Sequence, residues 1–157
     1  MTFTAWLNRW HMTKLSIKTP IAELEWQPNE KDREAAWELY IELLTRITTQ
    51  PLPVGAGDEK AALESVHDLF QLTRDVLKTK GRDCVEFTKI AIIVLNQKVR
   101  PFTSKWHQPS LQGTLSGPDR SREFRTDLEA VQSDLRIYTR MLADIAGVED
   151  LTDLAID

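Results

Sequence analysis

Near the C-terminal end of the chain, apolar residues recur at alternating spacings of four and three over three heptads. The series is Phe124, Leu128, Val131, Leu135, Tyr138, Leu142 and Ile145. Because an α-helix has about 3.6 residues per turn, this spacing places the series along one seam of a long helix. Such a seam is stable only when other elements cover it. The pattern predicts packed helices with the seam in the chain's own core, and an intermolecular coiled coil is the alternative.

Two further helices are predicted in the first half of the chain. The first begins at the N-cap Asn29 and runs to about Thr49, and the second begins at the N-cap Asp58 and runs to Lys80, with Gly81 as its stop signal. Side-chain oxygens of Asn and Asp accept hydrogen bonds from the first turn of a helix, and glycine adopts the conformation that ends one. The apolar face predicted for the first helix consists of Trp37, Tyr40, Ile41, Leu44 and Ile47, with Glu34, Glu38 and Glu42 facing solvent.

A third helix is predicted from the residues that follow Gly81. Asp83 and Glu86 resemble a capping box, and the apolar run 90–95 is typical of a central, fully packed element. Pro101 has no backbone N–H group, so we expect this helix to kink or stop near Arg100. Residues 107–119 are then predicted to form the longest loop.

The segments KLSIK (14–18) and AELEW (22–26) alternate polar and apolar residues, which predicts two short paired strands. A lone hairpin is marginally stable, so it should pack on the helices or on another chain. The predicted fold is all-α, an antiparallel four-helix bundle with a short N-terminal helix and a small β-hairpin. The predicted divisions are an N-terminal amphipathic segment with the β element (1–28), a helical bundle (29–148) and an acidic tail (149–157).

Composition argues against several functional classes. The chain has one cysteine, Cys84, so an internal disulfide is excluded. No apolar run approaches the roughly 20 residues needed to span a bilayer, so a membrane-spanning helix is not expected. No signal-peptide core is visible, so we expect a cytoplasmic protein, with peripheral contact at the inner membrane as an alternative. Glu64 and His67 form one Glu-x-x-His pair, where dimetal bundles use two. We therefore expect no metal, cofactor or catalytic residue, and no enzyme.

Cations concentrate in one stretch of a chain whose net charge is −4. In an antiparallel bundle, the end of the third helix and the start of the last meet at one pole, with Phe102 and Trp106 as stacking surfaces. This pole is predicted to bind a nucleotide, a phosphate or an acidic partner segment. The alternative is a solvated end with ion pairs to Asp119 and Glu123, and duplex DNA is disfavoured because the chain is acidic. The predicted anion-binding residues are Lys98, Arg100, Lys105, His107, Arg120, Arg122 and Arg125.

The N-terminal residues Phe3, Trp6, Leu7 and Trp10 share one face of a short predicted helix. We expect this face to bind a protein partner or a second copy of the chain. Two alternatives remain: contact with an anionic membrane surface, and simple packing over the bundle.

The segments AAWELYIELLTRITTQPL (35–52) and IIVLNQKVRPFTSKWH (92–107) resemble uncharacterised bacterial helical proteins. In some of those proteins a membrane segment precedes a stretch similar to KLSIKTPIAELEW (14–26), and the resemblance covers roughly residues 14–150. It carries over no functional residue. It implies a setting in regulatory, mobile-element or phage-defence gene clusters.

These observations predict a non-enzymatic protein-interaction module of a bacterial regulatory or defence-type system. The alternative function is a sensor domain that binds an anionic small molecule, such as a nucleotide, at the basic pole.

Overall fold

The computed structural model describes residues 1–12, 14–55 and 58–154. The chain is mostly helical, so the prediction of an all-α protein is confirmed. Residues 155–157 of the predicted acidic tail lie outside the described residues. The elements are α1 (Phe3–Arg9), α2 (Thr19–Ala22), α3 (Glu30–Leu44), α4 (Glu59–Lys80), the 3₁₀ turn η1 (Gly81–Asp83), α5 (Val85–Val94), the π-helical segment η2 (Leu95–Val99), α6 (Arg100–Leu111) and α7 (Pro118–Ala146).

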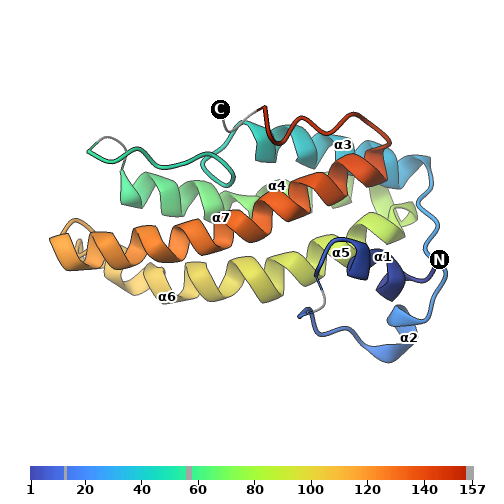
Figure 1. Cartoon of the computed structure of the whole chain (residues 1–157), viewed down its shortest axis with the longest axis horizontal. Helices are drawn as coiled ribbons and strands as arrows, with labels where there is room; N and C mark the ends of the chain where they lie inside the picture. Colours follow the sequence, from blue (N-terminus) through green and yellow to red (C-terminus); the bar gives the residue numbers. More distant parts are fainter. Residues whose placement is uncertain (13, 56–57, 155–157) are drawn as a thin grey trace.

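Helices α3, α4 and α7 lie alongside one continuous rod made of α5, η2 and α6 (Figure 1). Along the chain, α4 runs opposite to α3, the α5–η2–α6 rod runs opposite to α4, and α7 runs opposite to that rod. Helix α7 packs most extensively against α3, and it also contacts α4, η2 and α6. None of the described helices is both long and apolar enough to cross a membrane.

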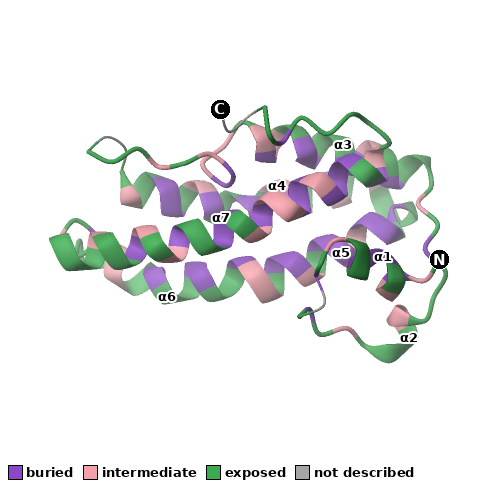
Figure 2. Ribbon diagram, viewed as in Figure 1, coloured by how far each residue is buried: buried purple, intermediate pink, exposed green. Residues whose placement is uncertain are grey.

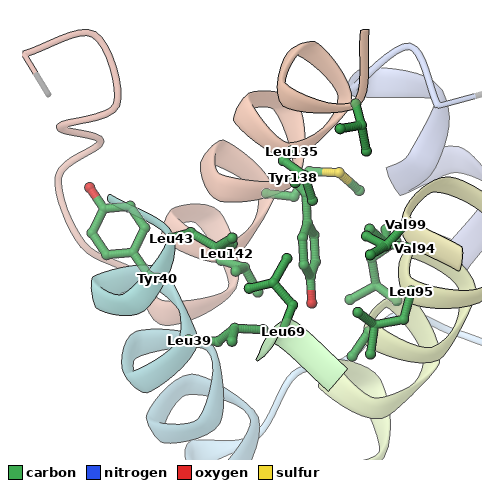
Figure 3. Packing of buried hydrophobic residues seen from close by; sticks show 14 of the residues in the cluster. Leu39, Tyr40, Leu43, Leu69, Val94, Leu95, Val99, Leu135, Tyr138 and Leu142 are labelled. Carbon is green, nitrogen blue, oxygen red and sulfur yellow. The ribbon is translucent and has the colours of Figure 1, made fainter. Parts of the chain in front are cut away.

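The apolar seam of α7 lies in the core of this chain, as predicted. Figure 3 shows Leu135, Tyr138 and Leu142 of α7 among apolar side chains from α3, α4, α5 and η2. Figure 2 shows the same division along α7, where buried positions alternate with exposed ones. Helix α7 begins at Pro118 and ends at Ala146, and the next residue, Gly147, has a left-handed φ of 69° that favours glycine.

The third rod does not stop at Pro101. The N–H of Arg100 donates to the carbonyl of Leu95, five residues earlier, and this π-helical turn places Pro101 in the first turn of α6. A proline needs no N–H partner there, so the helix continues to Leu111, and the predicted loop 107–119 is wrong over its first residues. Within the apolar run 90–95, Ile92 is 47% exposed, so the rod is not packed on all sides.

The predicted β-hairpin is wrong. Residues 19–22 form α2, and Glu25 makes an isolated antiparallel bridge with Thr2 instead of pairing with residues 14–18. The N–H of Trp26 donates to the carbonyl of Met1 at 2.8 Å, and the terminal ammonium of Met1 lies 2.7 Å from a carboxylate oxygen of Glu25. The second segment therefore pairs with the N-terminus.

Capping follows the sequence at two helices and departs from it at a third. Asn29 and Asp58 cap α3 and α4 as predicted. The expected box of Asp83 and Glu86 is absent, because the residue before α5, Cys84, makes no side-chain cap. The carboxylate of Asp32 on α3 accepts the N–H of Phe87 on α5 at 2.9 Å instead.

Candidate functional site

The cations predicted to bind an anion are largely engaged with carboxylates. Lys105 on α6 lies 3.1 Å from Glu123 and 2.7 Å from Asp127, both on α7. Hydrogen bonds from the lysine to Asp127 and to Glu123 raise the pKa of Lys105. Arg120 also contacts Glu123, at 3.2 Å. Two of the predicted anion ligands therefore share the same acid.

Two more cations near the start of α7 have acidic partners. Arg122 lies 3.8 Å from Asp119, one turn earlier. Arg125 points to Glu59 at the start of α4, at 2.9 Å, and also donates to the carbonyls of Leu52 and Pro53. Arg125 thus ties the 50–55 segment to α7.

The other predicted ligands lie further along the rods. Lys98 lies 3.6 Å from Asp134, and the guanidinium of Arg100 stacks 4.6 Å from the ring centre of Phe70. His107 is exposed on α6. Of these three residues, Lys98 is the one with an acidic partner among the described ion pairs, whereas the side chain of Arg100 contacts the ring of Phe70 and the amide oxygen of Asn96.

The aromatic residues expected to flank this pole are not open stacking surfaces. Trp106 is fully buried and donates its indole N–H to Asp127 at 3.0 Å, and Phe102 is 6% exposed. The ring of Trp106 packs edge-on against Phe124. Their role in the structure is to fill the core between α6 and α7.

The N-terminal aromatic face, predicted to bind a partner, is turned inward. Phe3, Trp6 and Leu7 are buried, and Trp10 is half-buried. Trp6 stacks on Trp26 with ring centres 4.1 Å apart, and its indole N–H donates to Asp144 of α7 at 2.8 Å. A short helix with a strongly apolar face gains most by covering that face on its own core, so the packing alternative describes these residues.

Trp37 is the tryptophan that faces solvent. All five tryptophans lie in the described part of the chain, and Trp37 is 45% exposed. Ile41, one turn later on α3, is 41% exposed. The predicted apolar face of α3 is therefore wrong at these two positions. Among the residues that face the core instead are Ala35, Ala36, Leu39 and Leu43.

A groove runs between α3 and α4 at this exposed apolar pair, with a volume of about 420 Å³. Its lining consists of Trp37, Glu38, Ile41, Glu42, Leu72, Asp75, Val76 and Thr79. Trp37 and Ile41 stand one helical turn apart on α3, as Leu72 and Val76 do on α4. Two short apolar rows therefore border a groove whose charged residues are all acids.

Ion pairs join α3 and α4 near both ends of this groove. At one end Lys80 lies 3.1 Å from Glu34 and 2.8 Å from Glu38. Its hydrogen bonds to Glu38 and Glu34 raise the pKa of Lys80, and the bond from Lys80 lowers the pKa of Glu34. At the other end Arg46 lies 2.9 Å from Glu42 of α3 and 3.7 Å from Asp68 of α4.

Asp75 lines the groove from α4. Its carboxylate accepts a hydrogen bond from the side-chain amide of Gln71 at 2.8 Å, and none of the ion pairs between described residues includes it. Glu38 is already paired with Lys80, and Glu42 is already paired with Arg46. Asp75 is thus the groove carboxylate with its charge still open to a cation.

No family model matches the chain, and no curated protein and no solved structure matches it.

The described residues contain no group of three or more His, Cys, Asp or Glu side chains arranged to hold a metal ion. His67 lies at the surface beside Phe70, with ring centres 5.8 Å apart. Cys84 is buried, and its Sγ lies 3.2 Å from the carbonyl oxygen of Gly81. The α3–α4 groove is therefore the candidate site with the clearest chemistry.

Sequence reasoning missed this groove although a signal for it exists. The stretch 35–44 contains apolar residues at eight of ten positions, interrupted by Glu38 and Glu42. One face of a helix holds only three to four apolar residues per two turns, so a second, outward-facing apolar row is expected from the excess.

Proposed function

We propose that this protein is a non-enzymatic protein-interaction module and that the α3–α4 groove is its binding site. The observation that carries the proposal is Trp37, 45% exposed beside the exposed Ile41. Large aromatic side chains are costly to leave in water and are enriched among the residues that dominate protein–protein affinity. An exposed tryptophan that lines a groove supplies such an anchor.

We also propose that α3, α4, the α5–η2–α6 rod and α7 form an antiparallel four-helix bundle. The alternating directions of the rods in Figure 1 support this arrangement. In such a bundle both walls of the groove are braced by the common core, and the ion pairs of Lys80 and Arg46 hold the walls together. A preformed groove lowers the entropic cost of binding.

The alternative, a nucleotide sensor at the basic pole, has weaker support. Lys105 and Arg120 would have to exchange Glu123 for a phosphate, and Arg125 would have to leave Glu59. The setting in a bacterial regulatory or defence-type system, and a place in the cytoplasm, stay part of our proposal. They rest on the resemblance of segments 35–52 and 92–107 and on composition.

Site-specific crosslinking tests the proposal. The photoreactive amino acid p-benzoylphenylalanine is placed at Thr79, which lines the groove and leaves Trp37 intact, in the cells that make the protein. Thr126, an exposed threonine on α7, is the matched control position. We expect a discrete protein adduct from position 79 and none from position 126.

The crosslinked partner is then purified and titrated against the unmodified chain. Ile41→Glu places a charge in the apolar row on α3 and is expected to weaken binding by about tenfold or more, measured by calorimetry. Identical adducts from both positions, or equal affinity for the Ile41→Glu chain, would show that the groove is not the site.

A further inference from the structure

We propose that the occupant of the α3–α4 groove is an amphipathic α-helix of a partner protein that carries lysine or arginine beside its apolar stripe. This inference rests on the proposed function and deepens it by naming the chemistry of the partner. Three features support it: the spacing of the apolar rows, the sign of the charge in the groove and the helical character of both walls.

The apolar rows fit the periodicity of a helix. Trp37 and Ile41 are spaced i, i+4 on α3, and Leu72 and Val76 are spaced i, i+4 on α4, so each row spans about 6 Å along its helix. An incoming helix that lies along the groove presents its own side chains at i and i+3 or i+4 with the same repeat. Its apolar stripe then fills the space between the rows.

The charge of the groove selects a cationic partner. Its lining contains the acids Glu38, Glu42 and Asp75 and no lysine or arginine. Glu38 and Glu42 already have intramolecular cations, whereas Asp75 accepts only the amide of Gln71 among its described hydrogen bonds and ion pairs. A lysine or arginine of the incoming helix therefore meets an open carboxylate at Asp75.

The walls favour a helix over other occupants. Both walls are α-helices whose backbone groups are engaged within their own turns, so they offer no free strand edge for an extended peptide. A nucleotide or other anion would face three carboxylates. A second copy docked face to face would bring the same acids opposite one another, which is repulsive.

Synthetic peptides of about four helical turns, roughly 15 residues, provide the probe. One peptide carries leucine at helical spacing with lysine elsewhere, one carries glutamate in place of lysine, and one has the lysine composition in an order without helical periodicity. Each is titrated into the full chain, and affinity is measured by fluorescence anisotropy. We expect the periodic lysine peptide to bind about tenfold or more tightly than either of the others.

Variants of the protein locate the site. Ile41→Ser, which removes apolar surface without adding a charge, and Asp75→Asn are both expected to weaken binding of the periodic lysine peptide several-fold. Asp119→Asn, which also removes one exposed carboxylate but lies at the start of α7, is expected to leave the affinity unchanged. Circular dichroism checks that each variant is folded.

Three results would overturn the inference. Equal affinity for the lysine and glutamate peptides, lost in Ile41→Ser, would leave a protein-binding groove without the predicted charge preference. A dimer of the chain alone, lost in Ile41→Glu by analytical ultracentrifugation, would make a second copy the occupant. Binding that is the same in Asp75→Asn and in Asp119→Asn would place the peptide elsewhere. Failure of the crosslink at position 79 would instead contradict the proposed function, because no partner would then bind at the groove.

Discussion

At the scale of single residues, two tyrosines allow a direct test of how the core treats polar groups. Tyr138 of α7 is buried, and its hydroxyl has no hydrogen-bond partner among the described residues. Figure 3 shows its ring among Leu69, Val94 and Leu95. Burial raises the pKa of this hydroxyl, so it stays neutral, but a donor without an acceptor still costs free energy. Tyr138→Phe is therefore expected to stabilise the protein by about 1 kcal/mol, measured by urea unfolding.

Tyr40 is the matched control for that prediction. Its hydroxyl donates to the carbonyl of Glu149 at 3.2 Å and accepts the N–H of Leu151 at 2.8 Å, so it ties the C-terminal segment to α3. Tyr40→Phe breaks both bonds and is expected to cost about 1 kcal/mol. If Tyr138→Phe destabilises the chain as much as Tyr40→Phe does, an ordered water satisfies the Tyr138 hydroxyl and the prediction is wrong.

At the scale of elements, one carboxylate serves two helix starts. Asp32 accepts the N–H of Asn29 at 2.8 Å and the N–H of Phe87 at 2.9 Å, in the interior between α3 and α5. Asp32→Ala leaves both donors without a partner and is expected to cost about 2–4 kcal/mol by urea unfolding. Asp58→Ala, which removes the exposed cap of α4, is expected to cost about 1 kcal/mol. Equal losses in the two variants would contradict the double role of Asp32.

Acidity adds a second measurement for Asp32. Burial raises the pKa of this carboxyl above 3.8, so the folded state binds its proton more tightly than the unfolded state does. Protonation therefore favours folding, and the contribution of Asp32 to stability rises as the pH falls through its folded pKa. The difference in unfolding free energy between the wild type and Asp32→Ala should widen as the pH is lowered toward 3.8.

How far the sequence predicts an element depends on whether the deciding contacts are local. The seam of α7 and the caps Asn29 and Asp58 depend on residues within one helix, and these predictions are confirmed. On an α-helical repeat Pro101 predicts a kink or a stop near Arg100, but one π-helical turn lets the helix continue. The hairpin failed because residues 24–26 pair with residues 1–3, a choice that local alternation does not specify.

At the scale of the whole molecule, the candidate site was harder to predict than the fold. Counting charges along the sequence identified a basic stretch, but Lys105 meets Asp127, 22 residues away, and Arg125 meets Glu59 on another helix. The exposed pair Trp37 and Ile41 depends on which side of α3 the other helices cover. Charge partners and exposed faces are both set by tertiary packing, so composition alone could not locate them.

The N-terminal segment gives the last prediction, because it is part of the core and not an appendage. Phe3 and Trp6 stack with Trp26, and Trp6 bonds to Asp144 near the end of α7. Removal of residues 1–26 takes these buried rings away and uncovers apolar surface on α5 and α7. We expect a clearly lower melting temperature by circular dichroism and new binding of the dye ANS, which reports exposed apolar surface.

The double variant Asn8→Ala with Arg9→Ala supplies the control for this truncation, because it alters only the exposed side of α1. Its melting temperature should equal that of the wild type. If the truncated chain also melts with the wild type and binds no ANS, α1 contributes nothing to the core. The face of Phe3, Trp6, Leu7 and Trp10 would then be free to leave the bundle and bind a partner, and the α3–α4 groove would have a competitor.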